Sequence, residues 1–453
     1  MIDLSRPQHV HVVGAGGAGM SAIAQVLSTM GHQVSGSDLK SSPMFERLRH
    51  AGLELSLGHD AGHVAGASAV AISSAVPASN VEVAEAERLG IPVLSRADVL
   101  SAIAALRRTI AVAGTHGKTT TASMLSLVLV EAGLRPSFII GGDVNDIGTN
   151  AVWDDGEWLV VEADESDGTF LRLSPEIAVV TNVDPDHLEH YGSFEALEES
   201  FRGFMAGASS CVVSADDPTA SALAPPGAFT FGEAEGAALV MSEVTSARSE
   251  VAFALSLRGE DLGTFSLAVP GAYNARNAVA AVAAACLLGV EPTVARRALA
   301  RFAGVARRFE FRGERNGVTF VDDYAHLPNE VRAALAAGRS GGFTRVVAVF
   351  QPHRFSRIAT LAPAFADAFV DADAVFVTQI YAAGEAPRPG VSGQLVVDAV
   401  RAAHPDATIE YVPSHEGLLE RLRGELRPGD LCLSLEAGDL TSLPDELLGD
   451  ERW

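Results

Sequence analysis

Short apolar runs alternate with longer helical stretches over the first hundred residues. Runs at 10–13, 33–38 and 69–73 have the length of buried strands, and an Ala-, Met- and Leu-rich stretch separates the first two. Strands that alternate with helices in this way predict βαβ units and a parallel sheet. We expect a further strand around Val93 and a helix over 95–106 that leads out of this first unit.

A second strand-helix pattern follows, with an apolar run at 109–113, a glycine-rich turn and a helical stretch at 118–132. Further apolar strands are predicted at 158–162 and 177–181. Because a new glycine-rich loop opens after the first unit is complete, we predict a domain boundary near residue 107.

The last part of the chain contains a third alternation. Alternating residues over 238–269 predict less helical structure, the Ala-rich stretch 277–288 predicts a helix, and another helix is expected to end near residue 303. We then expect a linker near residue 313, followed by strands at 318–321, 345–350, 374–378 and 431–435.

Together these patterns predict an α/β fold of three domains. A Rossmann-like domain is expected at 1–106, a central P-loop ATPase-type α/β domain at 107–312 and a second Rossmann-like α/β domain at 313–453. The chain has 453 residues and is 48% hydrophobic, which is more than a single core needs.

The charge of the chain disfavours one class of partner. There are 57 acidic against 33 basic residues, and the formal net charge is −24. A partner whose affinity depends on neutralising many phosphates is disfavoured, so we do not expect nucleic-acid binding. Lysine occurs only at Lys40 and Lys118, so nearly all positive charge is carried by arginine.

The cysteines and the apolar runs indicate the compartment. Cys211, Cys286 and Cys432 are far apart and form no CxxC pair, which is typical of a reducing compartment. We see no charged-then-apolar leader and no apolar run long enough to span a bilayer. We therefore expect a cytoplasmic protein without membrane insertion.

The first candidate for chemistry is the sequence GAGGAG at 14–19. It lies directly after a predicted strand and at the head of a helix, and Asp38 ends the next strand. Glycines let the backbone approach a diphosphate, and the helix N-terminus offers free N–H groups. Alone, this pattern favours NAD and leaves open another diphosphate ligand, such as a UDP-sugar, or a tight turn with close helix packing.

The second candidate is GTHGKTT at 114–120, again between a strand and a helix. A Gly-Lys-Thr loop wraps backbone N–H groups around phosphates, its lysine reaches the β and γ oxygens, and the next hydroxyl holds Mg²⁺. Strict Walker A spacing would require glycine where this chain has Val112, so the loop is shorter than that of a generic NTPase. Lys118 nevertheless stands where this chemistry needs a lysine.

Two acidic segments follow strands of the same predicted sheet. EADESD at 162–167 follows one strand, and TNVDPDH at 181–187 follows the next. Ligands of open α/β sheets bind at the carboxyl ends of the strands. Carboxylates and an imidazole beside a phosphate loop suit Mg²⁺ that bridges nucleotide and substrate. A solvated acidic loop is the alternative for the first segment.

Taken in order, these segments resemble those of the Mur ligases, the ATP-dependent amino-acid ligases of peptidoglycan synthesis. His116 within the second loop favours the alanine-adding branch of that family. The resemblance spans all three predicted domains and extends to later motifs, which are Asn274 with Asn277, RRFE at 307–310, DDYAHLP at 322–328 and QPHRFSR at 351–357.

The resemblance implies a binding role for each domain. The first domain would bind UDP-N-acetylmuramate rather than NAD, through Gly14, Gly16, Gly17, Gly19, Met20, Asp38, Ser73 and Ser74. ATP would be bound by Gly114, Thr115, His116, Gly117, Lys118, Thr119, Thr120, Asn277, Arg308 and Asp323. Mg²⁺ would be bound by Thr119, Glu162 and His187.

The resemblance also implies a reaction. The lactyl carboxylate of the UDP-sugar would attack the γ-phosphate of ATP to give an acyl phosphate, from which the amine of L-alanine would displace phosphate. The implied contacts of the amino acid are Tyr324, His353, Arg354 and Arg357. The implied catalytic residues are Lys118, His187, Arg308, His326, His353, Arg354 and Arg357, and a structural ion pair is the alternative for the histidines and arginines of the third domain.

The chain departs from the family pattern in three places. Several Mur ligases carry a carbamylated lysine near the metal, but between residues 107 and 313 this chain has only Lys118. Leu327 stands where a second histidine is common, and Glu436 replaces a small residue.

Three other functions stay open from the sequence. A recycling ligase that joins a tripeptide to the same UDP-sugar shares the GTHGKTT loop. An NAD-dependent oxidoreductase with an ATP-binding domain would explain 14–19 and leave the later motifs unexplained. A P-loop module that binds ATP without catalysis is the third alternative. For the assembly, we expect a monomer or a homodimer.

Overall fold

The computed structural model describes residues 2–73, 75–166 and 168–450. Among these residues, no helix combines the length and the apolar character needed to cross a bilayer. Contacts divide the chain into two compact units. Unit 1 comprises Met1–Ser242, Ala254–Gly263 and Arg276–Arg301, and unit 2 comprises Glu243–Phe253, Thr264–Ala275 and Phe302–Trp453.

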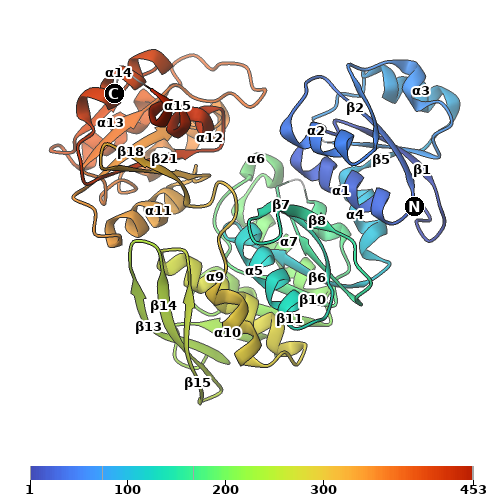
Figure 1. Ribbon diagram of the computed structural model, residues 1–453, viewed down its shortest axis with the longest axis horizontal. Helices are drawn as coiled ribbons and strands as arrows, with labels where there is room; N and C mark the ends of the chain where they lie inside the picture. The colour runs from blue at the N-terminus through green and yellow to red at the C-terminus, as the bar shows by residue number, and fades with distance from the viewer. Residues whose placement is uncertain (1, 74, 167, 451–453) are drawn as a thin grey trace. The chain divides into compact units, whose positions relative to one another are not determined.

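Unit 1 begins with a five-stranded parallel sheet in the order β3-β2-β1-β4-β5, drawn in blue in Figure 1. This confirms the predicted βαβ pattern. Its strands are β1 His9–Val13, β2 Gln33–Asp38, β3 Glu54–Leu57, β4 Ala69–Ile72 and β5 Val93–Ser95. Its helices are α1 Ala18–Thr29, α2 Pro43–His50, the 3₁₀ helix η1 Ala61–Val64, α3 Val81–Leu89 and α4 Arg96–Ala104.

The first sheet has a crevice where its strand order reverses. The neighbours of β1 are β2 and β4, so the loops that leave β1 and β4 diverge at the carboxyl ends of the strands. A Cβ placed on Gly14 would lie 3.3 Å from the Ser73 hydroxyl, so the ends of β1 and β4 are in contact there. Open α/β sheets bind ligands at such a point.

A ten-stranded sheet follows, in the order β15-β14-β13-β12-β11-β10-β6-β9-β7-β8. Its strands from β13 to β7 in that order run parallel, and β8 is antiparallel to β7. The bounds are β6 Arg108–Ala113, β7 Ser137–Val144, β8 Thr149–Val152, β9 Trp158–Glu162, β10 Ile177–Val180, β11 Ser210–Ser214, β12 Phe229–Gly232, β13 Leu239–Ser246, β14 Val251–Leu257 and β15 Glu260–Leu267.

The strand β6 lies inside the parallel part of this sheet, between β9 and β10. It is buried from Thr109 to Ala113, as expected of a parallel strand that is covered on both faces. Because the carboxyl ends of parallel strands lie at one edge, the glycine-rich loop after β6 and both acidic segments meet there.

Helices surround the ten-stranded sheet, and the Ala-rich α9 is largely buried. The predicted helices at 118–132 and 277–288 are confirmed as α5 and α9. The bounds are α5 Lys118–Glu131, the 3₁₀ helix η2 Thr169–Arg172, α6 Leu188–Tyr191, α7 Phe194–Ala206, α8 Pro218–Leu223, α9 Ala272–Leu287 and α10 Pro292–Ala300.

The C-terminal sheet, in unit 2, has the order β16-β17-β21-β18-β19-β20. All neighbours run parallel except β16 and β17. Its strands are β16 Glu310–Arg315, β17 Val318–Asp323, β18 Arg345–Gln351, β19 Ala374–Val377, β20 Ile409–Tyr411 and β21 Asp430–Glu436. Its helices are α11 Pro328–Ser340, α12 Phe355–Leu361, the 3₁₀ helix η3 Ala362–Phe365, α13 Gln394–Ala403, α14 His415–Glu425, the 3₁₀ helix η4 Leu440–Ser442 and α15 Leu443–Gly449.

Two strands of the C-terminal sheet, β16 and β20, have no counterpart in the sequence prediction, and both lie at its edges. The strand β16 reads EFRGER and lies at the edge of the sheet, where Phe311 is 64% exposed. An exposed edge strand lacks the apolar run by which the other strands are recognised. Residue 313, near which we expected a linker, lies within β16. The domain boundaries near 107 and 313 stay predictions.

Candidate functional site

The first glycine-rich loop packs against the end of β2. Gly14 N–H donates to Ser37 O at 2.8 Å, and Gly16 N–H donates to Asp38 Oδ2 at 2.8 Å. Gly14 has a φ of +80°, and a Cβ on Gly16 would lie 2.9 Å from Ser42 Oγ. The first position therefore needs a left-handed backbone and the second a close approach, and glycine provides both.

The other residues expected to bind the UDP-sugar differ in their surroundings. Gly17 is the N-cap of α1, and a Cβ on Gly19 would lie 3.2 Å from Nη1 of Arg96. Met20 is only 2% exposed and belongs to the hydrophobic core, so its side chain has a packing role. Ser74 lies outside the described residues.

A cavity of about 330 Å³ opens beside this crevice, lined in part by Ser73, Arg96 and Arg172. Arg96 also pairs with Asp164 at 3.1 Å, so it links the first glycine-rich loop to the acidic segment after β9. The sequence alone does not point to Arg96, because a single arginine at the start of a helix belongs to no motif. Its nearness to Gly19 becomes apparent only in the folded chain.

Lys118 is the central cation of the second glycine-rich loop. Its Nζ donates to Gly114 O at 2.6 Å and lies 2.8 Å from Glu165 Oε2. Burial alone would lower the pKa of Lys118, but the nearby carboxylates of Glu165, Asp164 and Glu162 raise it above its ordinary value. The ammonium therefore stays charged at neutral pH, as phosphate binding requires.

Two glycines give this loop its shape. Gly114 has a φ of +133°, and a Cβ there would lie 2.1 Å from Thr181 Oγ1. Gly117 has a φ of +81°, and a Cβ there would lie 2.3 Å from Asn277 Oδ1. A side chain at either position would be strained and would collide. Asn277, expected near the adenine, thus lies directly beside the loop.

The segment after β10 holds the loop through His116. Asn182 Oδ1 accepts the His116 N–H at 2.8 Å, and Thr181 Oγ1 donates to His116 O at 2.6 Å. The carboxylate of Asp184 lies 3.0 Å from His116 Nε2. Asn182 and Asp184 lie in a segment that the sequence singled out, but their supporting role follows only from the pairing of β10 with β6.

Two threonines of the GTHGKTT segment, Thr115 and Thr120, are also held in place. Thr115 Oγ1 accepts the Asp184 N–H at 2.9 Å, and Thr120 is 5% exposed in the first turn of α5. Residues 114–117 of GTHGKTT therefore form one ordered turn after β6, and residues 118–120 form the first turn of α5.

Two of the three residues expected to bind Mg²⁺, Thr119 and Glu162, are hydrogen-bonded to each other. Thr119 Oγ1 donates to Glu162 Oε1 at 3.0 Å, and Glu162 Oε2 accepts the Gly141 N–H at 2.7 Å. His187 follows β10, and its Nε2 lies 3.1 Å from Asp186 Oδ2. Among the described residues, no group of three or more His, Cys, Asp or Glu is placed to hold a metal. The hydroxyl of Thr119 and the carboxylate of Glu162 fit Mg²⁺, because this ion usually takes few protein ligands and fills its other coordination positions with phosphate and water.

Neighbouring carboxylates of the acidic segment hold their protons differently. Burial raises the pKa of Asp164, but Lys118 and Arg96 outweigh it and lower the pKa to about 2. Burial and the charge of Asp164 raise the pKa of Glu165, although Lys118 opposes them. Asp167, at the end of this segment, lies outside the described residues.

Unit 2 contains the residues expected to bind the amino acid, and also Asp323, which was expected to contact ATP. Asp323 ends β17 and accepts the N–H groups of Phe309 at 2.7 Å and Ala325 at 2.8 Å. Burial raises its pKa to about 6, although Arg308 opposes the shift. Asp323, expected to contact ATP, therefore ties the RRFE segment to the end of β17.

Three predicted side chains of unit 2 form a row of rings. The ring centroids of Tyr324 and His326 are 5.5 Å apart, and those of His326 and His353 are also 5.5 Å apart. The His353 ring stacks on Tyr381 at 5.6 Å. The guanidinium of Arg308 lies 5.1 Å from the Tyr324 centroid, which places a cation at one end of the row.

Two arginines lie at the other end of this row. Arg357 is 9% exposed, and its Nη1 lies 3.0 Å from His353 Nδ1. Arg354 has a φ of +69°, and its N–H donates to Tyr381 O at 2.8 Å. The DDYAHLP and QPHRFSR segments meet because β17 and β18 are the two neighbours of β21.

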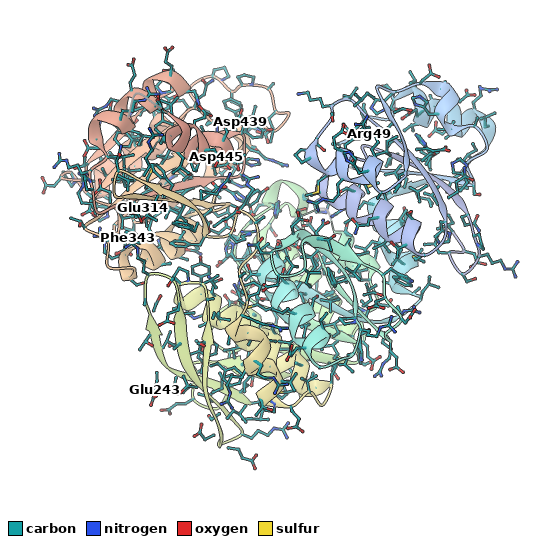
Figure 2. All side chains as sticks on the ribbon, in the orientation of Figure 1. Arg49, Glu243, Glu314, Phe343, Asp439 and Asp445 are labelled. Carbon is teal, nitrogen blue, oxygen red and sulfur yellow. The ribbon has the colours of Figure 1, made fainter. Side chains whose placement is uncertain are left out.

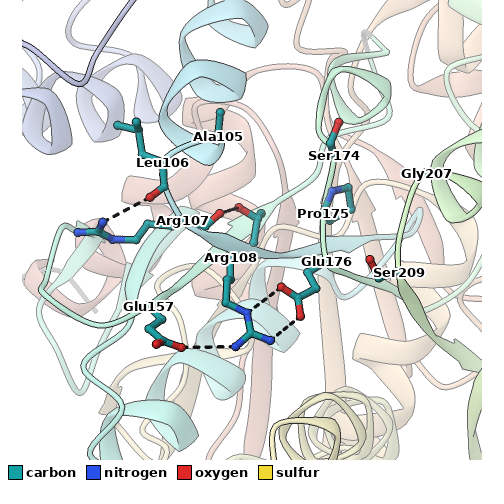
Figure 3. Close-up of a pocket in the computed structure, with 11 residues that line it drawn as sticks. Ala105, Leu106, Arg107, Arg108, Glu157, Ser174, Pro175, Glu176, Gly207 and Ser209 are labelled. Atoms are coloured by element: carbon teal, nitrogen blue, oxygen red, sulfur yellow. Dashed lines mark hydrogen bonds and ion pairs between the residues drawn. The ribbon is translucent and has the colours of Figure 1, made fainter.

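A larger cavity, of about 700 Å³, lies at the opposite edge of the ten-stranded sheet (Figure 3). It is lined by residues at or just before the starts of β6, β9, β10 and β11. Arg108 pairs there with Glu157 at 3.4 Å and with Glu176. None of the predicted site residues that the structure describes lines this cavity, so cavity size alone points away from the sheet edge at which the glycine-rich loop and the acidic segments meet.

Family models match three successive parts of the chain, and they agree with a three-sheet α/β fold that carries a P-loop. These are "Mur ligase family, catalytic domain" at residues 9–108, "Mur ligase middle domain" at 112–285 and "Mur ligase, glutamate ligase domain" at 307–435. The chain belongs to the Mur ligase family.

Relatives with one particular name are similar over nearly the whole chain. A UDP-N-acetylmuramate–L-alanine ligase of Anaeromyxobacter sp. (strain Fw109-5) is 46% identical over 452 residues, which is 98% of each chain. The solved UDP-N-acetylmuramate-alanine ligase MurC of Thermotoga maritima has a TM-score of 0.84 at 28% identity, over 97% of this chain and 98% of that one. A murein peptide ligase of Psychrobacter arcticus has a TM-score of 0.71 at 23% identity, over 97% and 98%. The predicted fold class is confirmed.

Proposed function

We propose that this chain joins L-alanine to the lactyl carboxylate of UDP-N-acetylmuramate, with cleavage of ATP, in peptidoglycan synthesis. One observation carries the proposal. The loop with Lys118 and His116 meets both acidic segments at one sheet edge, in a chain 46% identical to a ligase named for this reaction. This function assigns the first glycine-rich loop to a UDP-sugar rather than to NAD.

The first step brings anions together. A carboxylate oxygen attacks the γ-phosphorus and the bond to the β–γ bridging oxygen breaks, which releases ADP and leaves an acyl phosphate. Lys118, now 2.8 Å from Glu165, would turn to the phosphate oxygens and neutralise part of their charge. Its raised pKa keeps it protonated for this role.

Mg²⁺ fits the oxygen donors beside this lysine. Thr119 and Glu162 would hold it, with His187 as the third predicted contact. When bound, the ion would neutralise phosphate charge and orient the nucleotide. Asn277 would contact the nucleotide from beside Gly117.

The crevice of the first sheet would bind the UDP-sugar. Gly14 and Gly16 allow close approach of a diphosphate, and Gly17 and Gly19 lie at the N-terminus of α1, the end of a helix that favours anions. Asp38 and Ser73 border the same crevice. Arg96, beside Gly19, adds a cation that the sequence did not reveal.

The second step forms the amide bond. The alanine amine attacks the acyl carbon, phosphate leaves, and the amine loses a proton. Arg354 and Arg357 would bind the alanine carboxylate, while His326 and His353 would take up the proton and Arg308 would contact phosphate. Because two of the three substrates, ATP and the UDP-sugar, are nucleotides, we place the enzyme in the cytoplasm. Its assembly as a monomer or a homodimer stays a prediction.

The proposal is tested by the release of phosphate from Mg-ATP. UDP-N-acetylmuramate is supplied with L-alanine, glycine, L-serine, D-glutamate or the tripeptide in separate reactions. We expect release that requires both the UDP-sugar and L-alanine. Release with the tripeptide but with none of the amino acids would assign the recycling reaction instead. Release at the same rate without the UDP-sugar would contradict the proposal.

A further inference from the structure

A buried carboxylate that takes no part in the steps above lies beneath the amino-acid site. Glu436 is the last residue of β21 and is 0% exposed. Register places it opposite Gln351, the last residue of β18, at the base of the segment that carries His353. A buried carboxylate is costly unless it is paired, so its partners indicate its role.

On one side, Glu436 binds Arg307. Its carboxylate and its carbonyl oxygen both accept from Nη2 of that arginine. Arg307 has a φ of +60°, a left-handed conformation that is unfavourable for an arginine unless its surroundings hold it. Its carbonyl accepts the Tyr324 N–H at 2.9 Å, and its guanidinium lies 4.9 Å from the Tyr324 ring centroid. Glu436 thus anchors the turn that presents Arg308 and Tyr324.

On the other side, Glu436 accepts the Gly438 N–H at 2.6 Å. Gly438 is tightly packed, because a Cβ there would lie 2.3 Å from Gln351 Oε1 and 2.6 Å from Tyr381 Cγ. Tyr381 is the ring on which His353 stacks. Glu436 therefore also fixes the backbone that supports His353.

We propose that Glu436 is a positioning residue of the amino-acid site. Through Arg307 and Gly438 it sets the spacing between Tyr324 and His353, the two walls between which His326 lies. The inference rests on the proposed function, because it assumes that these walls contact the amino acid.

Glu436 belongs to a larger buried cluster of charges. Asp322 is 0% exposed, and its Oδ2 lies 3.7 Å from Arg307 Nε and 3.9 Å from Arg312 Nη1. Burial and the charge of Glu436 raise the pKa of Asp322 to about 7. The charge beside Arg307 therefore changes near neutral pH. The charged groups that face the Glu436–Asp322 pair are Arg307, Arg312, Asp323 and Asp439, the last of which is labelled in Figure 2.

The variant Glu436→Gln tests the inference, because it keeps the shape of the side chain and an acceptor for Gly438 but removes the charge that binds Arg307. We expect kcat to fall by about tenfold or more and KM for L-alanine to rise by about tenfold, with KM for UDP-N-acetylmuramate within about twofold. The inflection of kcat against pH should move to lower pH, because Asp322 loses a like charge.

Glu410→Gln is the matched control. Glu410 lies in the same unit, is 45% exposed and pairs with Arg421 at 2.6 Å, so its loss should leave the kinetics within about twofold. If Glu436 acts through Arg307, the double variant of Glu436→Gln and Arg307→Gln should be no worse than Arg307→Gln alone. If the effects of the two single variants multiplied in the double variant, the inference would be overturned. An unchanged KM for L-alanine together with an unchanged pH profile in Glu436→Gln would also overturn it.

Two further measurements cover the remaining outcomes. If Glu436→Gln does not fold, Gly438→Ala perturbs the same support from the loop and should raise KM for L-alanine; an unchanged value would overturn the inference. If the wild-type chain releases no alanine-dependent phosphate, the proposed function fails. Hydrogen exchange of the backbone amides then tests the positioning role of Glu436. Glu436→Gln should speed exchange at residues 307–309 and 437–439, and unchanged exchange would refute the role.

Discussion

Asp164 near the nucleotide loop and Asp322 in the C-terminal sheet hold their protons very differently. Asp164 has a pKa of about 2, because Lys118 and Arg96 outweigh the effect of burial. Asp322 has a pKa of about 7, because burial and Glu436 outweigh the arginines beside it. Asp164 beside the nucleotide loop therefore keeps its charge around neutral pH, whereas Asp322, in the support of the amino-acid site, changes its charge there.

This difference follows from what each region must do. Phosphate groups are anionic at all physiological pH values, so a permanent cation beside the permanent carboxylate of Asp164 suits the loop. The amino-acid site must accept a proton from an ammonium, and groups whose pKa lies near neutrality suit that step. We expect substitutions in the two regions to differ in size and in pH dependence.

The largest effect is expected at Lys118. Lys118→Ala removes the ammonium of the loop, and no other lysine occurs between residues 107 and 313. Alanine-dependent phosphate release should fall by about 10³-fold. Lys40, the other lysine of the chain, is exposed, so phosphate release by Lys40→Ala should stay within about twofold of the wild-type rate. If Lys118→Ala retained a tenth of wild-type activity, the fixed-charge account of the loop would fail.

A smaller effect is expected at Arg96. Arg96→Ala removes the cation beside Gly19 and leaves Asp164 with Lys118 as its remaining cation. KM for UDP-N-acetylmuramate should rise by about tenfold, or about 1.4 kcal/mol, and KM for L-alanine should not change. Arg88→Ala breaks an exposed pair with Glu85 and serves as the control. An unchanged KM for the UDP-sugar would remove Arg96 from the site.

The smallest effect concerns stability and has opposite signs in the two regions. The pKa of Asp322 is raised on folding, so the folded chain binds more protons than the unfolded chain between about pH 4 and pH 7, and stability falls as pH rises through that window. Asp322→Asn should therefore raise Tm at pH 8 by about 2–4 °C, with no gain at pH 4.

Asp164→Asn is the matched comparison. The pKa of Asp164 is lowered on folding, so its charge contributes stability above about pH 4 that is lost as pH falls through about 2. Its removal should lower Tm at pH 7. Calorimetry of the two variants measures both signs, and a Tm change of the same sign at pH 7–8 would contradict the contrast between the regions.

The position of the nucleotide loop could be inferred from the sequence, whereas the places of Arg96 and Glu436 could not, for a physical reason. Residues 114–120 are contiguous, and Glu162 follows an apolar strand, so their places could be inferred from local pattern and strand order. Arg96 and Glu436 act through partners distant in sequence, Gly19 and Arg307. Such pairings depend on tertiary packing, which periodicity does not encode.

The same limit applies to the fold. Buried parallel strands such as β6 and β18 were predicted because both faces are covered and the run is continuously apolar. The strands β3 and β16 lie at sheet edges and mix charged with apolar residues, so their sequence resembles that of a loop. Hydrophobic pattern therefore identified the buried strands β6, β9, β10 and β18, after which the site-bearing loops begin, but not the interior strands β7, β11 and β12.

The acyl phosphate is the central claim of the proposed reaction, and oxygen transfer tests it most directly. UDP-N-acetylmuramate labelled with ¹⁸O in its lactyl carboxylate is supplied with Mg-ATP and L-alanine, and the released phosphate is analysed by mass spectrometry. Attack of the carboxylate on the γ-phosphorus predicts one ¹⁸O atom in the phosphate of each turnover. Alanine-dependent phosphate that carries no ¹⁸O would contradict the mechanism.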